Sequence, residues 1–400
     1  MLDIIHGHLL CEGRCFHDYY IRIDQNVITA VGPMAFWKPL PNVQVIDAGK
    51  NYISPGFIDI HNHGALMCDA MDASFKAYDK ISEYHLKNGV TSFLLTTMTT
   101  PLEIIGHVID VLQEYIPKLP VNILGCHLEG PFLSAHNAGA HPIQHLRCPD
   151  RQSIKFLEKY KNYIKLITAA PELPHMDDLL AFCRANHIAI SGGHDHAIDD
   201  EIHAAIDGGL KSVTHIYCCS SGVSRRPGSY KKHLGLTQIG LLHPELFCEV
   251  IADDYHVPPE LFDFIYRCKG YQKICLISDG LSASGMPPGK YYLGQQGSGV
   301  PVIVDEHVAL LSDRSAFAGS ITSIGTMVGR LISRHTVLPQ EAVYMASAAP
   351  AKLLGLEHKG NIAPGFDAEL NILDSRGTLK TTIISENFIY HHKEDAKNEI

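Results

Sequence analysis

Five short apolar runs in this sequence each end on a side chain that can bind a divalent metal ion or transfer a proton. The runs cover residues 57–63, 123–129, 189–194, 212–215 and 274–279, and they end on His61 and His63, Glu129, His194, His215 and Asp279. In an α/β barrel, parallel strands bring their carboxyl ends together at one mouth. Five such runs in series therefore predict a barrel whose strands deliver histidine and carboxylate side chains to one site.

Strand-like runs alternate with helical patterns from residue 52 onward. The expected strands cover 53–61, 90–97, 121–129, 164–170, 187–193, 211–217, 246–253 and 273–279, and the clearest helical patterns cover 73–88, 101–117, 150–161, 174–186, 198–208 and 258–269. Eight alternating units favour a (β/α)8 barrel, an α/β fold of the TIM-barrel type, over a doubly wound sheet. Further helices are expected over 321–335 and 339–354.

Both ends of the chain have a different pattern, which is typical of short β-strands. Runs within residues 1–52 and 367–390 are separated by turn residues. Because isolated pieces of two or three strands are unstable alone, we expect the ends to pair into one small β-sandwich. The expected domains are residues 1–52 and 358–400 for the sandwich and 53–357 for the barrel, with a β-rich insertion at about 288–312.

Composition limits the partners and the compartment of the protein. The formal net charge of −10 disfavours nonspecific binding to nucleic acid. No apolar stretch approaches the roughly 20 residues of a membrane span, and the first residues lack the basic segment of a signal peptide. The eleven cysteines form no C-x-x-C pair, which favours buried thiols in a reducing compartment. We therefore expect a cytoplasmic protein without nucleic-acid or membrane partners.

The first of the five runs carries the sharpest sign of a metal site. Side chains two positions apart on a strand point to the same face, so His61 and His63 present two imidazoles together. Neutral imidazole and carboxylate are usual ligands of Zn²⁺ and Fe²⁺. A single histidine among the 25 in this chain would mean little. The shared position of all these residues at expected strand ends is what predicts a divalent metal centre.

Several motifs resemble one known family when they are taken in chain order. Residues 55–64, Pro-Gly-Phe-Ile-Asp-Ile-His-Asn-His-Gly, resemble the opening motif of the amidohydrolase superfamily. The motifs at 127–132, 193–194, 214–217, 251–257, 278–280 and 318–320 resemble the N-acetylglucosamine-6-phosphate deacetylase family. The resemblance implies a homodimeric, metal-dependent hydrolase that converts N-acetylglucosamine 6-phosphate to glucosamine 6-phosphate and acetate.

The resemblance also assigns roles to individual residues. It implies a principal Zn or Fe site of Glu129, His194 and His215, and a second ion, where one is bound, at His61 and His63. Asp279 matches the catalytic acid and base, and His141 matches a contact to the substrate carbonyl, whereas the matching substrate-binding positions are Arg225, His256, Cys218, Cys219 and Ser320. In the family, the arginine or histidine contact can come from a dimer partner.

The loop after His215 departs from the family pattern. The family has Asn-Ala where this chain has Cys218 and Cys219, and it has Glu where this chain has Arg226. The loop is either a retuned anionic pocket or an ordinary solvated loop, and the cysteines either pack or contact a ligand. His127 is expected to orient a metal ligand, and His196 is a ligand, a substrate contact or a surface residue.

The departure keeps other functions open. One is hydrolysis of another amino sugar such as N-acetylgalactosamine 6-phosphate, of an N-acyl amino acid or of a cyclic amide. The other is a non-catalytic scaffold with an amidohydrolase-like barrel. Retention of every candidate ligand favours an enzyme, in which Asp279 takes a proton from water and passes it to the leaving amine.

Overall fold

Eight parallel strands form the central sheet of the protein, and the predicted fold class is confirmed. The computed structural model describes residues 1–228 and 230–392. In sheet order the strands are β15 (Ile274–Leu276), β14 (Phe247–Val250), β13 (Ser212–Val213), β12 (Ala189–Gly192), β11 (Ile164–Ala169), β10 (Asn122–Glu129), β9 (Val90–Thr97) and β6 (Phe57–Asp59). A bridge between Asn62 and Gly280 brings the first and last strands together, so the barrel is nearly closed.

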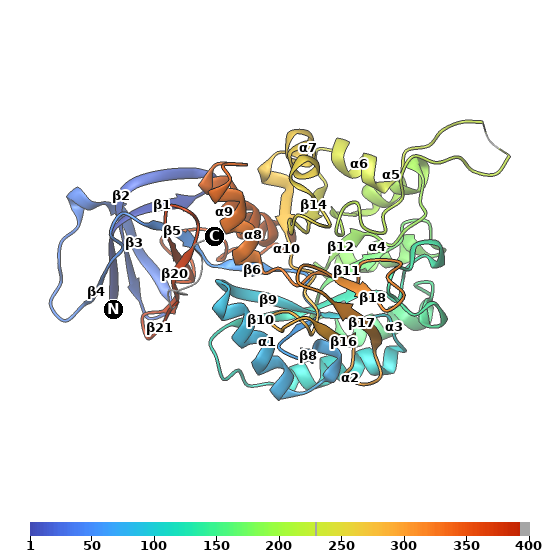
Figure 1. The fold of residues 1–400 in the computed structure, drawn as a ribbon, viewed down its shortest axis with the longest axis horizontal. Coiled ribbons are helices and arrows are strands. Elements are labelled where there is room, and N and C mark those ends of the chain that lie inside the picture. Colours follow the sequence, from blue (N-terminus) through green and yellow to red (C-terminus); the bar gives the residue numbers. More distant parts are fainter. Residues whose placement is uncertain (229, 393–400) are drawn as a thin grey trace.

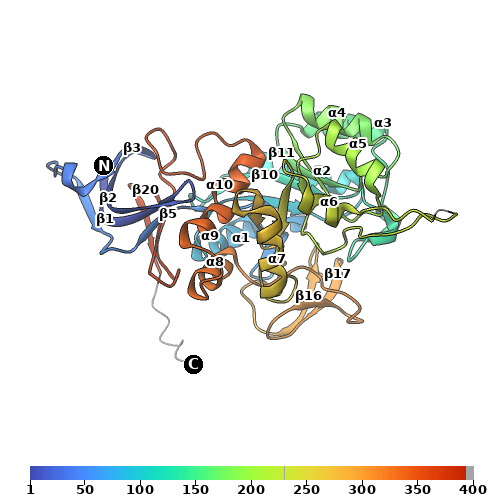
Figure 2. The ribbon, with the colours of Figure 1, turned by 90° about the horizontal axis from the view of Figure 1, so that it is seen from above.

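Helices surround the barrel strands (Figures 1 and 2). They are α1 (Phe75–Lys87), α2 (Leu102–Glu114), α3 (Arg151–Tyr160), α4 (Met176–Ala185), α5 (Asp199–Gly208), α6 (Leu236–Leu242), α7 (Pro259–Lys269), α8 (Ile324–Ser333), α9 (Pro339–Ala346) and α10 (Ala348–Leu354). Ser74 and Asp150 cap α1 and α3 by accepting backbone N–H groups of Ala77 and Ser153. All but α6 lie within segments where the sequence predicted helices.

The barrel strands other than β9 are shorter than the sequence predicted. The segment expected as one strand over 53–61 is divided at Gly56 into β5 (Tyr52–Pro55) and β6. A Cβ at Gly56 would lie 2.2 Å from Oγ1 of Thr91, so this close approach requires glycine. Beyond β13, His215 and Tyr217 have φ angles of 27° and 75°, which end the strand early.

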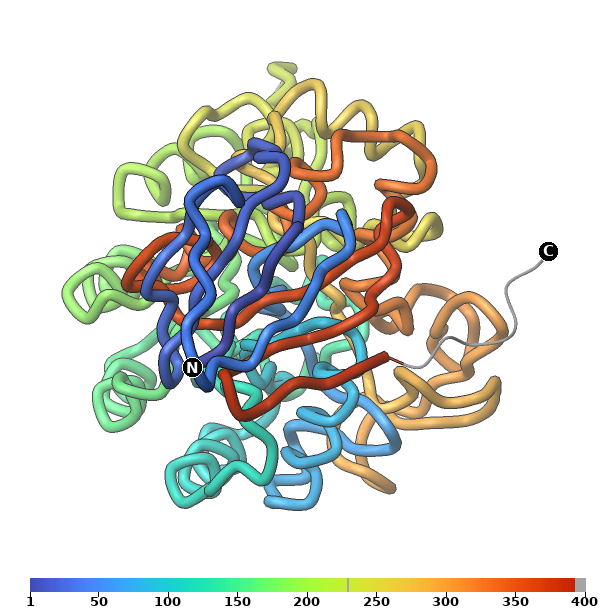
Figure 3. Tube along the Cα trace, turned by 90° about the vertical axis from the view of Figure 1, so that its left-hand side faces the viewer, coloured from blue at the N-terminus to red at the C-terminus, as the bar shows by residue number. Residues whose placement is uncertain are grey.

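Strands from both chain ends form one separate sheet, and Figure 3 shows them side by side in front of the barrel. The sheet contains β1 (Leu2–Cys11), β2 (Arg14–Asp24), β3 (Val27–Pro33), β4 (Gln44–Asp47), β5, β19 (Leu370–Leu373), β20 (Leu379–Ser385) and β21 (Phe388–His391). β5 lies between β1 and β19. Its buried Ile53 packs in a core with Leu2, Ile21 and Leu370.

A buried carboxylate connects this terminal sheet to the barrel. Glu369, just before β19, accepts hydrogen bonds from the Thr91 and Ser92 hydroxyls of β9 at 2.8 and 3.0 Å. It also accepts from the Asn122 amide at 2.5 Å and pairs with the ammonium group of Lys359. Each partner satisfies part of a charge that would otherwise be costly to bury.

The predicted β-rich insertion is a three-stranded antiparallel sheet of β16 (Gly289–Leu293), β17 (Val300–Val304) and β18 (Ala309–Leu311). Its inner residues Tyr291, Leu293 and Val302 pack in one apolar cluster with Met98, which follows β9. The insertion therefore packs against the carboxyl end of a barrel strand. Within residues 1–228 and 230–392, none of the helices is long and apolar enough to cross a membrane.

Candidate active site

Glu129, the last residue of β10, lies at the centre of a buried histidine cluster. Its Oε1 atom is 3.1 Å from Nε2 of His194 and 2.9 Å from Nε2 of His215. The two Nε2 atoms are 3.1 Å from each other. Three potential ligand atoms from three strand ends thus converge on one point.

Hydrogen bonds at Nδ1 set the tautomer of the two rings when they are neutral. His194 Nδ1 donates to the carbonyl oxygen of Asn137 at 2.9 Å, and His215 Nδ1 donates to that of Cys218 at 3.0 Å. In neutral rings, both Nε2 atoms then carry lone pairs that face each other and Glu129. A cation between them relieves this repulsion, and neighbouring ligands around tetrahedral Zn²⁺ lie roughly 3.3 Å apart. The residues fit a divalent metal ion.

A second group of ligand atoms surrounds the other oxygen of Glu129. Oε2 is 3.3 Å from Nε2 of His61 and 2.9 Å from Nε2 of His63. Oδ1 of Asp279 is 3.3 and 3.4 Å from the same two nitrogens. All four ligand atoms lie within 4.8 Å of one another. Glu129 can therefore serve two ions, one at each carboxylate oxygen.

His141 approaches the same carboxylate with a different protonation pattern. Its Nδ1 accepts the backbone N–H of Thr99 at 3.3 Å, which leaves the proton of the neutral ring on Nε2. Nε2 lies 3.4 Å from Glu129 Oε2. Burial lowers the pKa of His141 to about 4, so the ring is neutral near pH 7. His141 can donate a hydrogen bond from Nε2 into the site.

Three residues of this site have left-handed backbone conformations although they are not glycine. The φ angles are 48° for His194, 27° for His215 and 45° for Asp279. Such conformations are disfavoured for residues with a Cβ atom and tend to cluster where function requires them. Here each residue follows a barrel strand and turns its side chain toward Glu129.

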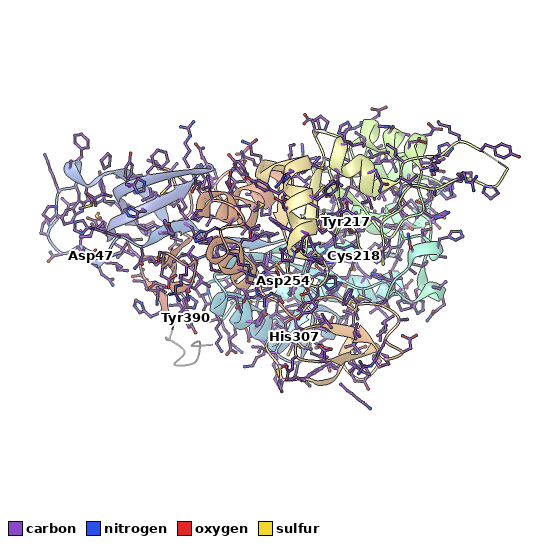
Figure 4. All side chains as sticks on the ribbon, turned by 45° about the horizontal axis from the view of Figure 1, so that its top comes forward. Asp47, Tyr217, Cys218, Asp254, His307 and Tyr390 are labelled. Atoms are coloured by element: carbon purple, nitrogen blue, oxygen red, sulfur yellow. The ribbon has the colours of Figure 1, made fainter. Side chains whose placement is uncertain are left out.

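A cavity of about 280 Å³ opens onto the metal-site residues. Tyr217, Cys218 and Cys219 form part of its wall; Figure 4 labels the first two, on the barrel side of the molecule. His256 and Phe317 form another part, and their rings pack at 4.4 Å between centroids. The cavity thus joins the candidate metal centre to a mixed polar and aromatic region.

Asp253 orients His256 toward this cavity. Asp253 Oδ2 accepts from Nδ1 of His256 at 2.7 Å and from the Ser320 hydroxyl at 2.9 Å. Because Nδ1 is used, Nε2 is the ring nitrogen left for a ligand. Ser320 is not among the described residues that line the cavity, so in this structure its hydroxyl supports Asp253.

Other predicted residues lie farther from the ligand atoms. Arg225 is exposed and is not among the described residues that line the cavity. It belongs to the loop after β13, whose described residues 222–228 and 230–234 extend away from the barrel (Figures 1 and 2). His196 is exposed and packs on His136, which matches the surface interpretation. His127 hydrogen-bonds Thr168 at 2.8 Å, and its ring meets His61 edge-on at 4.5 Å.

Sequence reasoning missed two groups that support the ligands. The carbonyl oxygen of Asn137 orients His194, and no side-chain pattern signals a backbone contact of this kind. Glu249, buried in β14, accepts from Ser191 and Ser212, and its Oε2 is 3.7 Å from Nδ1 of His61. The sequence did offer one sign of Glu249, because a carboxylate inside the apolar run 247–250 is unusual and needs a buried partner.

A nearly closed α/β barrel with histidine and carboxylate clusters at its mouth defines a metal-dependent hydrolase. The model of the Amidohydrolase family matches residues 52–393. The chain belongs to this family, in its N-acetylglucosamine-6-phosphate deacetylase branch.

Similar proteins cover nearly the whole chain. It is 33% identical to an N-acetylglucosamine-6-phosphate deacetylase of Lysinibacillus sphaericus, over 85% of this chain and 86% of the relative. It is 29% identical to an N-acetylgalactosamine-6-phosphate deacetylase of Escherichia coli O157:H7, over 92% and 93%. The solved N-acetylglucosamine-6-phosphate deacetylase of Pasteurella multocida superposes with a TM-score of 0.87 at 25% identity, covering 98% of this chain and 99% of that one.

Proposed function

We propose that this protein removes the acetyl group from an N-acetylated amino-sugar 6-phosphate, chiefly N-acetylglucosamine 6-phosphate. The products would be glucosamine 6-phosphate and acetate. The observation that carries this proposal is the arrangement around Glu129, where four histidines and Asp279 surround the two carboxylate oxygens. His141 adds a hydrogen-bond donor at the same place.

Glu129, His194 and His215 would hold a principal zinc or iron ion, and His61, His63 and Asp279 would hold a second. Two contacts support this division: His194 and His215 lie close to Oε1 of Glu129, and His61 and His63 lie close to Oε2. Asp279 lies beside His61 and His63. A bound divalent ion supplies Lewis acidity and lowers the pKa of a bound water molecule to about 7. The site then has a strong nucleophile at neutral pH.

Side chains of the protein would transfer the protons and stabilise the negative charge on the carbonyl oxygen. Asp279 accepts a proton from the attacking water and delivers it to the leaving amine, as base and then acid. It lines the cavity, where a substrate nitrogen can reach it. His141 donates from Nε2 to the carbonyl oxygen as negative charge develops there.

The sugar and its phosphate group would occupy the region of His256 and Phe317. His256 is held by Asp253 with one ring nitrogen available, and Cys218 and Cys219 line the cavity nearby. Arg225 lies outside the cavity of its own chain. We therefore propose a homodimer in which Arg225 reaches the partner's site. The eleven free cysteines support a cytoplasmic location.

A second substrate has a specific observation in its favour. The relative from Escherichia coli O157:H7, at 29% identity, is named for N-acetylgalactosamine 6-phosphate. The two sugars differ only in the configuration of one hydroxyl group. The replaced residues Cys218 and Cys219 lie in the cavity, where they would influence this choice.

Acetate release by the purified protein tests the proposed function. The protein is loaded with Zn²⁺ or Fe²⁺, its metal content is measured, and both N-acetylhexosamine 6-phosphates are assayed beside their unphosphorylated forms. We expect release from a phosphorylated sugar and a loss of at least about 1,000-fold in Asp279→Asn. If the metal-loaded protein releases no acetate from either phosphorylated sugar, the assignment fails.

A further inference from the structure

A second cavity, of about 490 Å³, lies next to the candidate active site. Met98 and Leu293 line both cavities. Met98 follows the last residue of β9, and Leu293 ends β16 of the insertion. Both side chains are buried, with 5% and 4% exposure. They therefore form a wall between the active-site cavity and the second one.

The second cavity is an open chamber with a mixed lining, which includes the polar residues Gln144, His145 and Gln295. Beyond the wall, Ile104, Val300 and Pro301 contribute apolar surface to it. Met98 and Leu293 belong to one apolar cluster, which also contains Met71. A methionine side chain is unbranched and adapts its shape to what it contacts. The wall thus consists of two apolar side chains and is partly adjustable.

The position of the wall relates it to the reacting amide. Met98 precedes Thr99, whose backbone N–H binds Nδ1 of His141 at 3.3 Å. The carbonyl carbon of an amide carries an oxygen, a nitrogen and an acyl chain. In the proposed function the oxygen faces His141, and the nitrogen, with its sugar, faces Asp279 and His256. The acyl chain is left with the rest of the cavity wall, which includes the apolar side chains of Met98 and Leu293.

We propose that Met98 and Leu293 determine the acyl length that this enzyme accepts. This inference rests on the proposed function and extends it to the acyl side of the substrate. The wall stops the chain after the acetyl methyl group, and the chamber behind it has room for a longer one. Shortening Met98 would join the two cavities and admit N-butanoyl or N-hexanoyl glucosamine 6-phosphate.

The test compares kcat/KM for N-acetyl, N-butanoyl and N-hexanoyl glucosamine 6-phosphate. In Met98→Ala and Leu293→Ala we expect the ratio of butanoyl to acetyl to rise at least about tenfold, since a methylene is worth 10–200-fold in an apolar pocket. Met98→Val, a smaller truncation, replaces Met98→Ala in the assay if the alanine variant does not fold. Ile104→Ala, in the second chamber only, is the matched control and should keep the wild-type ratio.

Two outcomes would overturn the inference in different ways. In the first outcome, the acetyl substrate is hydrolysed but the truncations leave the butanoyl-to-acetyl ratio of kcat/KM at its wild-type value. The wall then does not determine the acyl length, and the proposed function stands. Calorimetric titration of the same compounds into metal-loaded Asp279→Asn, with and without Met98→Ala, measures the preference for acyl length as binding affinity, without turnover. If no compound of the series binds or reacts, the wall has no acyl group to contact, and both proposals fail.

Discussion

At the scale of single residues, the site depends on how each imidazole is protonated. Backbone carbonyl oxygens accept from Nδ1 of His194 and His215, so the neutral form of each ring presents an Nε2 lone pair. A backbone N–H donates to Nδ1 of His141, so that ring presents an Nε2 proton. The same residue type thus becomes a metal ligand or a hydrogen-bond donor according to one local contact.

Glu129→Gln should remove metal binding while leaving the fold intact. Both carboxylate oxygens face histidine nitrogens, and an amide offers neither the charge nor two acceptor atoms. We expect the metal content of the protein to fall and kcat/KM to drop at least about 100-fold. Elemental analysis after dialysis measures the first effect. Glu158→Gln, on the surface of α3, is the control, and equal metal content in both variants would contradict the assignment.

Asp253→Asn should weaken the hold on the phosphorylated substrate. The carboxylate of Asp253 accepts from Nδ1 of His256 at 2.7 Å and so holds the ring with Nε2 available to a phosphate group. We expect KM for the phosphorylated sugar to rise about tenfold, whereas kcat changes less than threefold. Asp254→Asn, which affects the neighbouring ion pair with Arg334, is the matched control.

The unphosphorylated sugar separates this role from a structural one. Its hydrolysis should respond little to Asp253→Asn, because it carries no anionic group for His256 to bind. An equal rise in KM for both sugars would contradict the assignment of Asp253 and His256 to the phosphate end.

At the scale of elements, the sequence predicted the order of the barrel well and its strand ends less well. β9 agrees with the expected 90–97, because eight successive buried residues make its pattern plain. β13 was expected over 211–217 but contains only Ser212 and Val213. The left-handed φ angles of His215 and Tyr217 end it, and apolar patterning does not report φ. α6 was missed because seven residues provide too little helical periodicity.

The same reasoning explains which parts of the site were predictable. Parallel strands bring their carboxyl ends together, so the meeting of Glu129 with His194 and His215 followed from their positions at expected strand ends. The place of Arg225 did not follow, because it lies on a long loop whose direction no periodic pattern specifies. The roles of these residues stay predictions until the variants are measured.

Helix α1 contains a residue that should make stability depend on pH. His85 is buried against Phe93, and burial lowers its pKa to about 3. The unfolded chain has the ordinary value of about 6.5 and binds more protons between these limits. Stability from the neutral ring is therefore complete above pH 6.5 and is lost as the pH falls toward 3. We expect a loss of about 2 kcal/mol by pH 5.

Urea unfolding of His85→Leu at pH 7 and pH 5 measures this effect. The variant should lose about 2 kcal/mol less than the wild type between the two pH values, because leucine does not titrate. His107→Leu, at an exposed position of α2, should retain the wild-type difference. A wild-type pH dependence in His85→Leu would show that other groups account for the loss.

At the scale of the whole molecule, the terminal sheet and the barrel have separate apolar cores. Glu369 crosses between them through Thr91 and Ser92 of β9. Lys359 neutralises it and also pairs with Asp367 at 2.8 Å. The two cores are thus linked by a buried, charged network as well as by the chain itself.

Glu369→Gln should destabilise the protein with little effect on catalysis. The change removes the buried one of the two counter-charges of Lys359, and breaking a buried pair costs about 3 kcal/mol. We expect the free energy of unfolding to fall by about 2 kcal/mol or more, while kcat/KM changes less than twofold. Glu83→Gln, which breaks exposed pairs with Lys80 and Lys87, should cost less than about 1 kcal/mol. Equal losses in both variants would contradict the linking role of Glu369.

The place of β5 between β1 and β19 has a consequence for synthesis of the protein on the ribosome. Pro55 ends β5, and its antiparallel partner begins at Leu370, 315 positions later. At 5–20 residues per second, the nascent chain waits roughly 15 to 60 seconds for that partner. During this interval one edge of β5 is open to pairing with other chains. Newly made molecules should depend on chaperones at this stage, although the finished sheet leaves that edge covered.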